Sequence, residues 1–188
     1  MHVIATAIPN VKIIEPRKFG DHRGFFSETY NKARFDEAMG RDYTFVQDNH
    51  SLSATVGTLR GLHFQRLPTP QDKLVRVTRG AVLDVAVDIR HGSPTFGQHV
   101  AVELSADNWR QLWVPVGFAH GFITRAPDTE VVYKVTGPYA PDCDGGIIWN
   151  DPALGIDWGA GDDGVVLSEK DGKLPTLAAL PELFTYDV

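Results

Sequence analysis

Side chains that can exchange protons or hold charge stand in or beside apolar, β-rich segments of this sequence: His63, Lys73, His120, Tyr133 and Asp171. Imidazole, phenol and carboxylate groups are the usual acids and bases of enzymes, and a lysine can stabilise developing negative charge. The set is suited to proton transfer without a bound cofactor. For any one of these residues alone, the simpler interpretation is a satisfied core or surface residue.

A metal site is the first alternative, because clustered histidines in β-barrels often hold one. Pro115-x-Gly-x-x-His120 resembles the second metal-binding motif of the cupin superfamily. The first cupin motif needs His-x-His with a following Glu, whereas the corresponding place here reads His63-Phe-Gln65. A catalytic metal normally takes three protein ligands, and only two imidazoles are offered. We therefore expect no metal and no other cofactor.

Motifs for other chemistries are missing from the sequence. It contains no Gly-x-Ser-x-Gly and no Walker loop, and Cys143 has no histidine near it in sequence. The Gly-x-Gly-x-x-Gly spacing at 159–164 lies in a turn-rich segment and does not follow a strand pattern. This argues against a nucleophilic triad, a dinucleotide-binding fold and phosphoryl transfer.

Composition limits the partners. The 188 residues carry 18 Lys+Arg against 24 Asp+Glu, a net charge of -6. This balance argues against binding nucleic acid or an anionic membrane by bulk charge, so an anionic ligand needs a local basic cluster. The length is typical of one domain, and we expect a single domain over 1–188.

Several features of the sequence predict a cytoplasmic location. A single cysteine excludes an internal disulfide, and the first residues show no signal-peptide pattern. The longest stretch without Asp, Glu, Lys or Arg, 111–124, is shorter than the roughly 20 apolar residues of a membrane span.

The dominant periodicity is two. Val85, Val87 and Ile89 alternate with more polar positions (Asp84, Ala86, Asp88), and 100–105 and 130–136 also read as strands with one buried face. Many short strands punctuated by Gly and Pro predict an all-β sandwich or barrel.

Helical signals are few. Asn31–Met39 is predicted to be a helix, capped by Asn31 and stopped by Gly40, and Leu177–Leu180 a second short one. The segment Asn150–Asp171 is rich in Gly and Asp, so we expect it to wrap around the outside of the barrel.

Several ordered motifs together resemble one enzyme family. They include Asp21–Glu28, 45–51, 59–65, 73–76, 84–90, 93–97, 111–115, 117–122, 145–147 and 154–158. At these places the chain is similar to the dTDP-4-dehydrorhamnose 3,5-epimerases, which have a cupin-type jelly-roll fold. The resemblance implies inversion of C3 and C5 of dTDP-4-dehydro-6-deoxy-D-glucose, giving dTDP-4-dehydro-β-L-rhamnose.

The resemblance also implies roles. His63 matches the catalytic base, Asp171 the carboxylate that orients it, and Tyr133 the acid on the opposite face of the sugar. Lys73 matches the cation that stabilises the enolate, and His120 a further contact near the sugar.

Further positions match substrate contacts: Arg23, Glu28, Gln47, Asp48, Asn49, Arg60, Asp144 and Lys170. Phe19 and Phe26 are candidates for stacking on thymine, and Tyr139 for setting the number of inversions. The family commonly has Glu where Asp144 stands, one methylene longer. The resemblance further implies a homodimer in which the N-terminal region of one chain completes the site of the other.

Alternatives remain open. A relative that inverts only C3 or only C5 of a similar dTDP-keto sugar would use the same base. A metal-dependent cupin and a catalytically silent sugar-nucleotide binding module are the alternatives from other classes.

Overall fold

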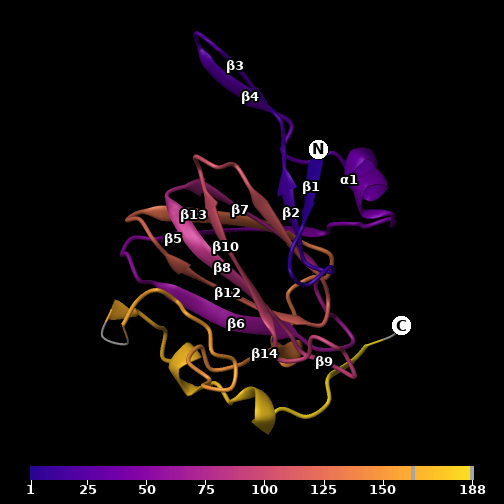
Figure 1. Ribbon diagram of the computed structural model, residues 1–188, viewed down its shortest axis with the longest axis vertical. Helices are drawn as coiled ribbons and strands as arrows, with labels where there is room; N and C mark the ends of the chain where they lie inside the picture. Colours follow the sequence, from indigo (N-terminus) through magenta and orange to yellow (C-terminus); the bar gives the residue numbers. More distant parts are fainter. Residues whose placement is uncertain (162–163, 187–188) are drawn as a thin grey trace.

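Alternation of apolar and polar residues places most of the chain in two facing antiparallel sheets (Figure 1). This computed structural model describes residues 1–161 and 164–186. The larger sheet has the order β1 (His2–Ala5), β2 (Lys12–Glu15), β11 (Gln111–Val114), β7 (Lys73–Arg79), β13 (Thr129–Val135), β5 (Gln47–Ser53). The second has the order β10 (His99–Ser105), β8 (Ala81–Asp88), β12 (Phe118–Thr124), β6 (Leu59–Gln65), β14 (Asp144–Gly146).

The core lies between the two sheets. Val75 and Val131 of the larger sheet pack in one cluster with Val82, Ala86 and Phe122 of the second sheet, all nearly inaccessible to solvent. Burying apolar surface between two sheets is the main driving force for a sandwich. The predicted all-β, jelly-roll architecture is therefore confirmed.

The prediction for β8 is wrong in one respect. Asp84, Ala86 and Asp88 were expected on a more polar face, yet each is fully buried. Strand β8 lies between β10 and β12, and the C-terminal segment covers the other face of its sheet. Because both faces are covered, the acidic residues are bonded internally, Asp84 by His120 and Asp88 by Arg90.

The helix prediction is confirmed. Helix α1 (Lys32–Met39) begins after Asn31, whose side chain accepts a hydrogen bond from the amide of Arg34. It ends at Gly40, whose φ of 71° suits a left-handed C-terminal cap. The expected second helix is shorter, a 3₁₀ turn η4 (Leu177–Ala179). The described part of the chain also includes the 3₁₀ turns η1 (Pro141–Cys143) and η3 (Asp171–Lys173).

The segment after β14 passes over the outside of the second sheet, as predicted (Figure 1). Leu154 and Trp158 pack with Leu62 and Phe64 of β6, although residues 162–163 lie outside the described part. Val166 then forms a parallel bridge with Thr58 at the start of β6. This bridge brings the end of the segment to the rim of the sandwich.

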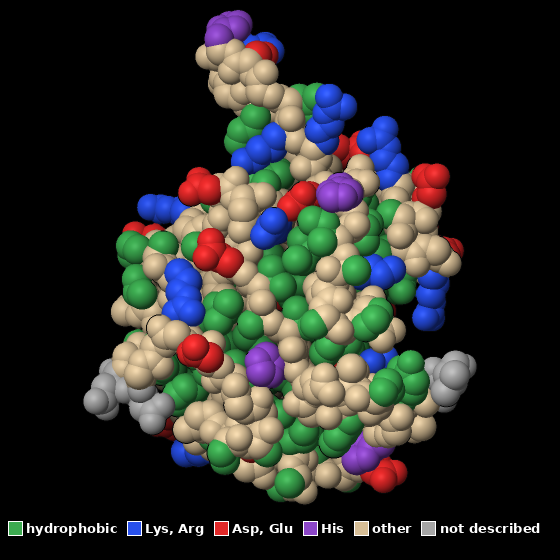
Figure 2. All heavy atoms as spheres, in the orientation of Figure 1, with side chains coloured by type: hydrophobic (Ala, Val, Ile, Leu, Met, Phe, Trp, Pro, Cys, Tyr) green, Lys and Arg blue, Asp and Glu red, His purple; other side chains and the backbone are tan. Residues whose placement is uncertain are grey.

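Two small pairings complete the fold. Strands β9 (Arg90–His91) and β15 (Phe184–Thr185) pair in parallel. Strands β3 (Lys18–Asp21) and β4 (Gly24–Ser27) form a hairpin that stands clear of the body (Figures 1 and 2). Within 1–161 and 164–186, no helix is long and apolar enough to cross a membrane.

Candidate active site

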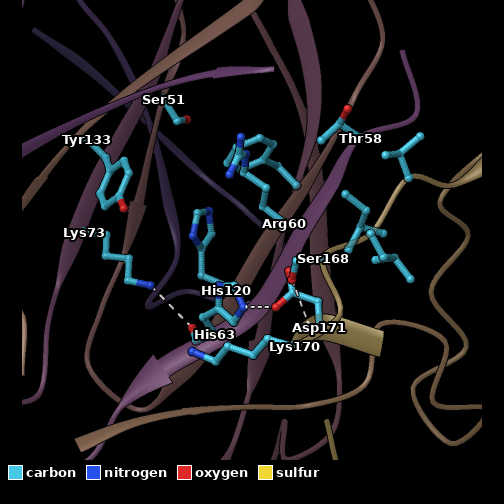
Figure 3. Close-up of a pocket in the computed structure, with 14 residues that line it drawn as sticks. Ser51, Thr58, Arg60, His63, Lys73, His120, Tyr133, Ser168, Lys170 and Asp171 are labelled. Carbon is cyan, nitrogen blue, oxygen red and sulfur yellow. Dashed lines mark hydrogen bonds and ion pairs between the residues drawn. The ribbon is translucent and has the colours of Figure 1, made fainter. Parts of the chain in front are cut away.

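A cavity of about 500 Å³ opens between the sheets at the rim (Figure 3). Both sheets and the C-terminal segment contribute polar groups to it. Its polar lining residues are Ser51, Thr58, Arg60, His63, Lys73, His120, Tyr133, Ser168, Lys170 and Asp171. The cavity therefore gathers all five proton-transfer candidates from distant parts of the sequence.

His63 and Asp171 form a tight pair. Nε2 of His63 lies 2.6 Å from Oδ1 of Asp171, whose side chain is only 6% exposed. Burial raises the pKa of Asp171, but hydrogen bonding by His63 and by the amide of Gly61 outweighs it, and the net pKa is lowered. Because Nε2 is bonded to Asp171, Nδ1 is the ring nitrogen left for other partners.

A close approach of two strands sets the position of His63. It lies opposite His120 in the register of β6 and β12. Gly61 has a φ of 131°, and an added Cβ would lie 2.5 Å from the Cα of Gly121. Only glycine fits there, and the contact lets β6 run against β12 with both imidazoles reaching the same cavity.

Lys73 places its ammonium group beside His63. It enters from β7 in the opposite sheet, is 9% exposed, and its Nζ donates to the carbonyl oxygen of His63 at 3.4 Å. Desolvation lowers the pKa of Lys73 to about 8, although the charges of Asp84 and Asp144 oppose the change. A cation so poorly hydrated stabilises an anion brought close to it.

Tyr133 also comes from the larger sheet, on β13 next to β7. Burial raises the pKa of its phenol, and the charge of Arg60 opposes this only in part. Figure 3 shows Tyr133 and Lys73 on one side of the pocket and Asp171 on the other, with the imidazoles between them. The phenol therefore keeps its proton and is available as an acid.

A second His–Asp pair was missed from the sequence. Nε2 of His120 lies 2.7 Å from Oδ1 of Asp84, which is fully buried. Oδ2 of Asp84 has no hydrogen-bond partner in the described part of the chain. The sequence did offer a sign of this pair, because Asp84 interrupts an apolar run. The alternation of the strand, however, predicted that Asp84 faces solvent.

A smaller hollow adjoins the main cavity and shares His63, Lys73, Tyr133 and Lys170 with it. Tyr139 and Asp144 line this hollow, and Asp144 is ion-paired with Lys170. Gln47 accepts a hydrogen bond from the amide of Tyr139 at 3.0 Å and donates to Asn49 at 2.7 Å. These groups form a polar extension toward solvent.

Arg60 lies at the mouth of the cavity. Its guanidinium donates to Oγ of Ser53 at 3.1 Å and to the carbonyl oxygen of Leu52 at 3.2 Å. These bonds hold a positive charge toward the cavity, where an anion could enter.

Several residues predicted to bind the substrate do not line the cavity of their own chain. Asp48 points to the outer face of the larger sheet, because strand side chains alternate, and pairs with Lys134 at 2.9 Å. In the hairpin, Phe19 and Phe26 are exposed and Arg23 pairs with Asp21. Glu28, just beyond it, pairs with Arg34 of α1.

The donor set does not suit a metal ion. In residues 1–161 and 164–186 no three His, Cys, Asp or Glu side chains are grouped to bind one. The two imidazoles of the cavity are each bonded to a separate carboxylate.

The sequence model of the dTDP-4-dehydrorhamnose 3,5-epimerases matches residues 5–179. The chain belongs to this family. It is 54% identical over 186 residues to the dTDP-4-dehydrorhamnose 3,5-epimerase of Sinorhizobium fredii, a match that covers 99% of this chain and 94% of that protein.

Solved structures of epimerases share the fold. The dTDP-6-deoxy-D-glucose-3,5-epimerase of Legionella pneumophila, in complex with dTDP-4-keto-L-rhamnose, is 47% identical with a TM-score of 0.95, over 100% of this chain and 99% of that one. A 3'-monoepimerase of Streptomyces bikiniensis in complex with dTDP-quinovose is 36% identical with a TM-score of 0.89, over 99% and 93%. This chain is thus a sugar-nucleotide epimerase of the cupin fold.

Proposed function

We propose that this epimerase inverts C3 and C5 of dTDP-4-dehydro-6-deoxy-D-glucose to give dTDP-4-dehydro-β-L-rhamnose. The observation that carries the proposal is the entry of His63 and Tyr133 into one cavity from opposite sheets. The identity of 54% to a 3,5-epimerase along nearly the whole chain supports the same reaction.

The chemistry begins with a carbon acid. The C4 ketone acidifies the hydrogens on C3 and C5, because the carbanion delocalises into an enolate. Nδ1 of His63 takes the proton from one face, while Asp171 stabilises the imidazolium that forms. The phenol of Tyr133 then gives a proton to the opposite face, and both groups regain their protonation states by exchange with solvent.

Lys73 stabilises the intermediate. Its ammonium group, beside His63 and poorly hydrated, is placed to balance the negative charge on the enolate oxygen. His120, held by Asp84, borders the same space and contacts the sugar. The step repeats at the second carbon after the ring turns in the cavity.

Nucleotide contacts come from the mouth and the adjoining hollow. Arg60 and Lys170 supply the positive charge that a diphosphate needs, against a net charge of -6 for the chain. Tyr139 offers an aromatic surface in the hollow beyond Lys73. Gln47 and Asn49 offer polar groups next to it, because Gln47 is hydrogen-bonded to both the amide of Tyr139 and the side chain of Asn49. Asp144, tied to Lys170, fixes the position of that lysine.

The active form we propose is a homodimer. Phe19, Phe25 and Phe26 are 50%, 55% and 70% exposed on a hairpin that stands clear of the body. A two-stranded hairpin is marginally stable alone, and exposed aromatic clusters mark interaction surfaces. A partner's cavity would bury Phe19 and Phe26 and receive Arg23, which does not reach the cavity of its own chain. Sedimentation that finds a fully active monomer would contradict the dimer.

The deciding experiment is turnover of dTDP-4-dehydro-6-deoxy-D-glucose in heavy water, with a 4-keto-reductase and NADPH trapping the product. We expect dTDP-L-rhamnose carrying deuterium at both C3 and C5 by NMR. Label at one carbon only, with a product inverted there, would instead identify a single-position epimerase. Binding without label or product would identify a silent module.

We also propose a cytoplasmic location, consistent with the free thiol of Cys143.

A further inference from the structure

Trp109 occupies an unusual backbone position at the foot of the hairpin. It lies in the turn between β10 and β11 and has a φ of 60°, a left-handed conformation that favours glycine or asparagine. The turn is well bonded around it. Asn108 accepts hydrogen bonds from the amides of Ser105 and Arg110, and the amide of Trp109 donates to the carbonyl oxygen of Ser105.

The indole ring of Trp109 is bonded to the hairpin itself. Its Nε1 donates to Oγ of Ser27, the last residue of β4, at 3.0 Å. The ring of Phe25 meets it edge to face, with centroids 4.9 Å apart and planes at 79°. The side chain of Trp109 thus contacts Phe25 and Ser27, two alternate residues on one face of β4.

Lys18, on β3, contacts the same two aromatic rings, those of Trp109 and Phe25. Its Nζ lies 4.2 Å from the centroid of Trp109 and 4.6 Å from that of Phe25. It also donates to the carbonyl oxygen of Ala106, in the turn that holds Trp109, at 3.4 Å. Both strands of the hairpin are therefore tied to the turn between β10 and β11.

The direction of the hairpin matters because of what it carries. Its strands have four residues each, too few to fix their own orientation on the body. Phe19 and Phe26 pair with each other between the contacted positions, and Arg23 lies beyond them at the tip, so a change of angle at Trp109 moves all three and moves Arg23 furthest. A strained residue kept at such a point indicates a functional constraint.

We propose that Trp109 is a positioning residue that sets the angle at which the hairpin leaves the body, and so places its Phe and Arg side chains in the partner's cavity. This inference rests on the homodimer of the proposed function. The residue acts on substrate binding through the hairpin and touches no reacting atom.

Trp109→Asn is the direct test, because asparagine accepts the left-handed backbone while losing every contact of the ring. We expect KM for the dTDP-keto sugar to rise about tenfold, kcat to stay within about twofold, and the melting temperature to hold or increase. Trp109→Phe retains the ring contacts but loses the bond to Ser27, so its KM should rise less. Asp128→Asn, at another left-handed non-glycine residue (φ 49°), is the matched control and should leave KM unchanged.

Hybrid dimers separate this proposal from the dimer on which it rests. In a hybrid of one Trp109→Asn chain and one His63→Ala chain, only the Trp109→Asn chain retains His63. The one catalytically active site is therefore in that chain. Hairpin exchange predicts that the His63→Ala chain supplies an intact hairpin and restores the normal KM. If KM stayed raised in the hybrid, Trp109 would still be a positioning residue. The hairpin would then act on the cavity of its own chain, and the exchange between chains would be wrong. A normal KM in Trp109→Asn, while Arg23→Ala raises it, would overturn the role of Trp109 and leave the exchange intact.

Discussion

His63 and Tyr133 reach one cavity from the two facing sheets of the sandwich, His63 on β6 and Tyr133 on β13. A sugar ring held between sheets has one face toward each. Inversion at carbon needs a base on one face and an acid on the other. This separation makes the cavity suited to epimerisation.

His63→Ala removes the proposed base. We expect loss of both epimerisation and exchange of solvent deuterium into C3 and C5, with kcat falling by a factor of at least about 10² to 10⁴. Asp171→Asn should lose less, because the imidazole remains but its orientation and charge balance do not. His91→Ala, on β9, is a control for loss of an imidazole elsewhere. Exchange that continued at both carbons in His63→Ala would assign the base to another residue.

Tyr133→Phe removes the proposed acid but leaves the proposed base. His63 can still remove a proton and return a deuteron to the same face, so exchange should continue without inversion. We expect epimerisation to fall about 10²-fold or more, with label in unreacted substrate by NMR. Tyr43→Phe, whose ring packs on Trp113 away from the cavity, is the control. Equal loss of exchange and inversion would argue against separate roles.

Lys73 should set the alkaline limit of activity. Its ammonium group is charged below its pKa of about 8, so its stabilising charge is present at lower pH and lost as pH rises through that value. The pKa of Tyr133 is raised by burial, so the phenol stays protonated in this range. We expect kcat/KM to fall about tenfold per pH unit above that limit. Lys73→Arg keeps its charge and should lack this decline, and a Lys73→Arg profile that falls at the same pH would assign the limit elsewhere.

Asp84→Asn tests the second pair. The amide is nearly isosteric but carries no charge, so His120 loses its ionic partner and the attraction on Lys73 weakens. An altered buried hydrogen bond of this kind costs about 1–3 kcal/mol, or roughly 5- to 150-fold. We expect the loss mainly in kcat, measured with the melting temperature as a control for folding. An unchanged kcat in a folded variant would show that Asp84 only fills the core.

Chelation tests the metal-dependent alternative. His63 and His120 are each held by a carboxylate, so we expect full activity after dialysis against EDTA and no stoichiometric metal by elemental analysis. An ion lost together with activity, and restored with it, would contradict the proposed mechanism.

Several features could be predicted from the sequence because their causes are local. Alternation of apolar side chains determines strands, and Asn31 and Gly40 bound helix α1 through their own backbone preferences. The residue types at 63, 73, 120, 133 and 171 indicated proton transfer, and the ordered motifs indicated the family. None of these inferences depends on knowing what lies across the core.

The tertiary structure alone decided which groups meet. Asp84 lies on a strand whose alternation suggests a solvent face, but coverage of both faces of β8 buries it against His120. Trp109 carries no sequence signal, and its contact with the hairpin spans residues far apart in the chain. Local patterns fix backbone conformation over a few residues, whereas the burial and pairing of a charge depend on packing between distant segments.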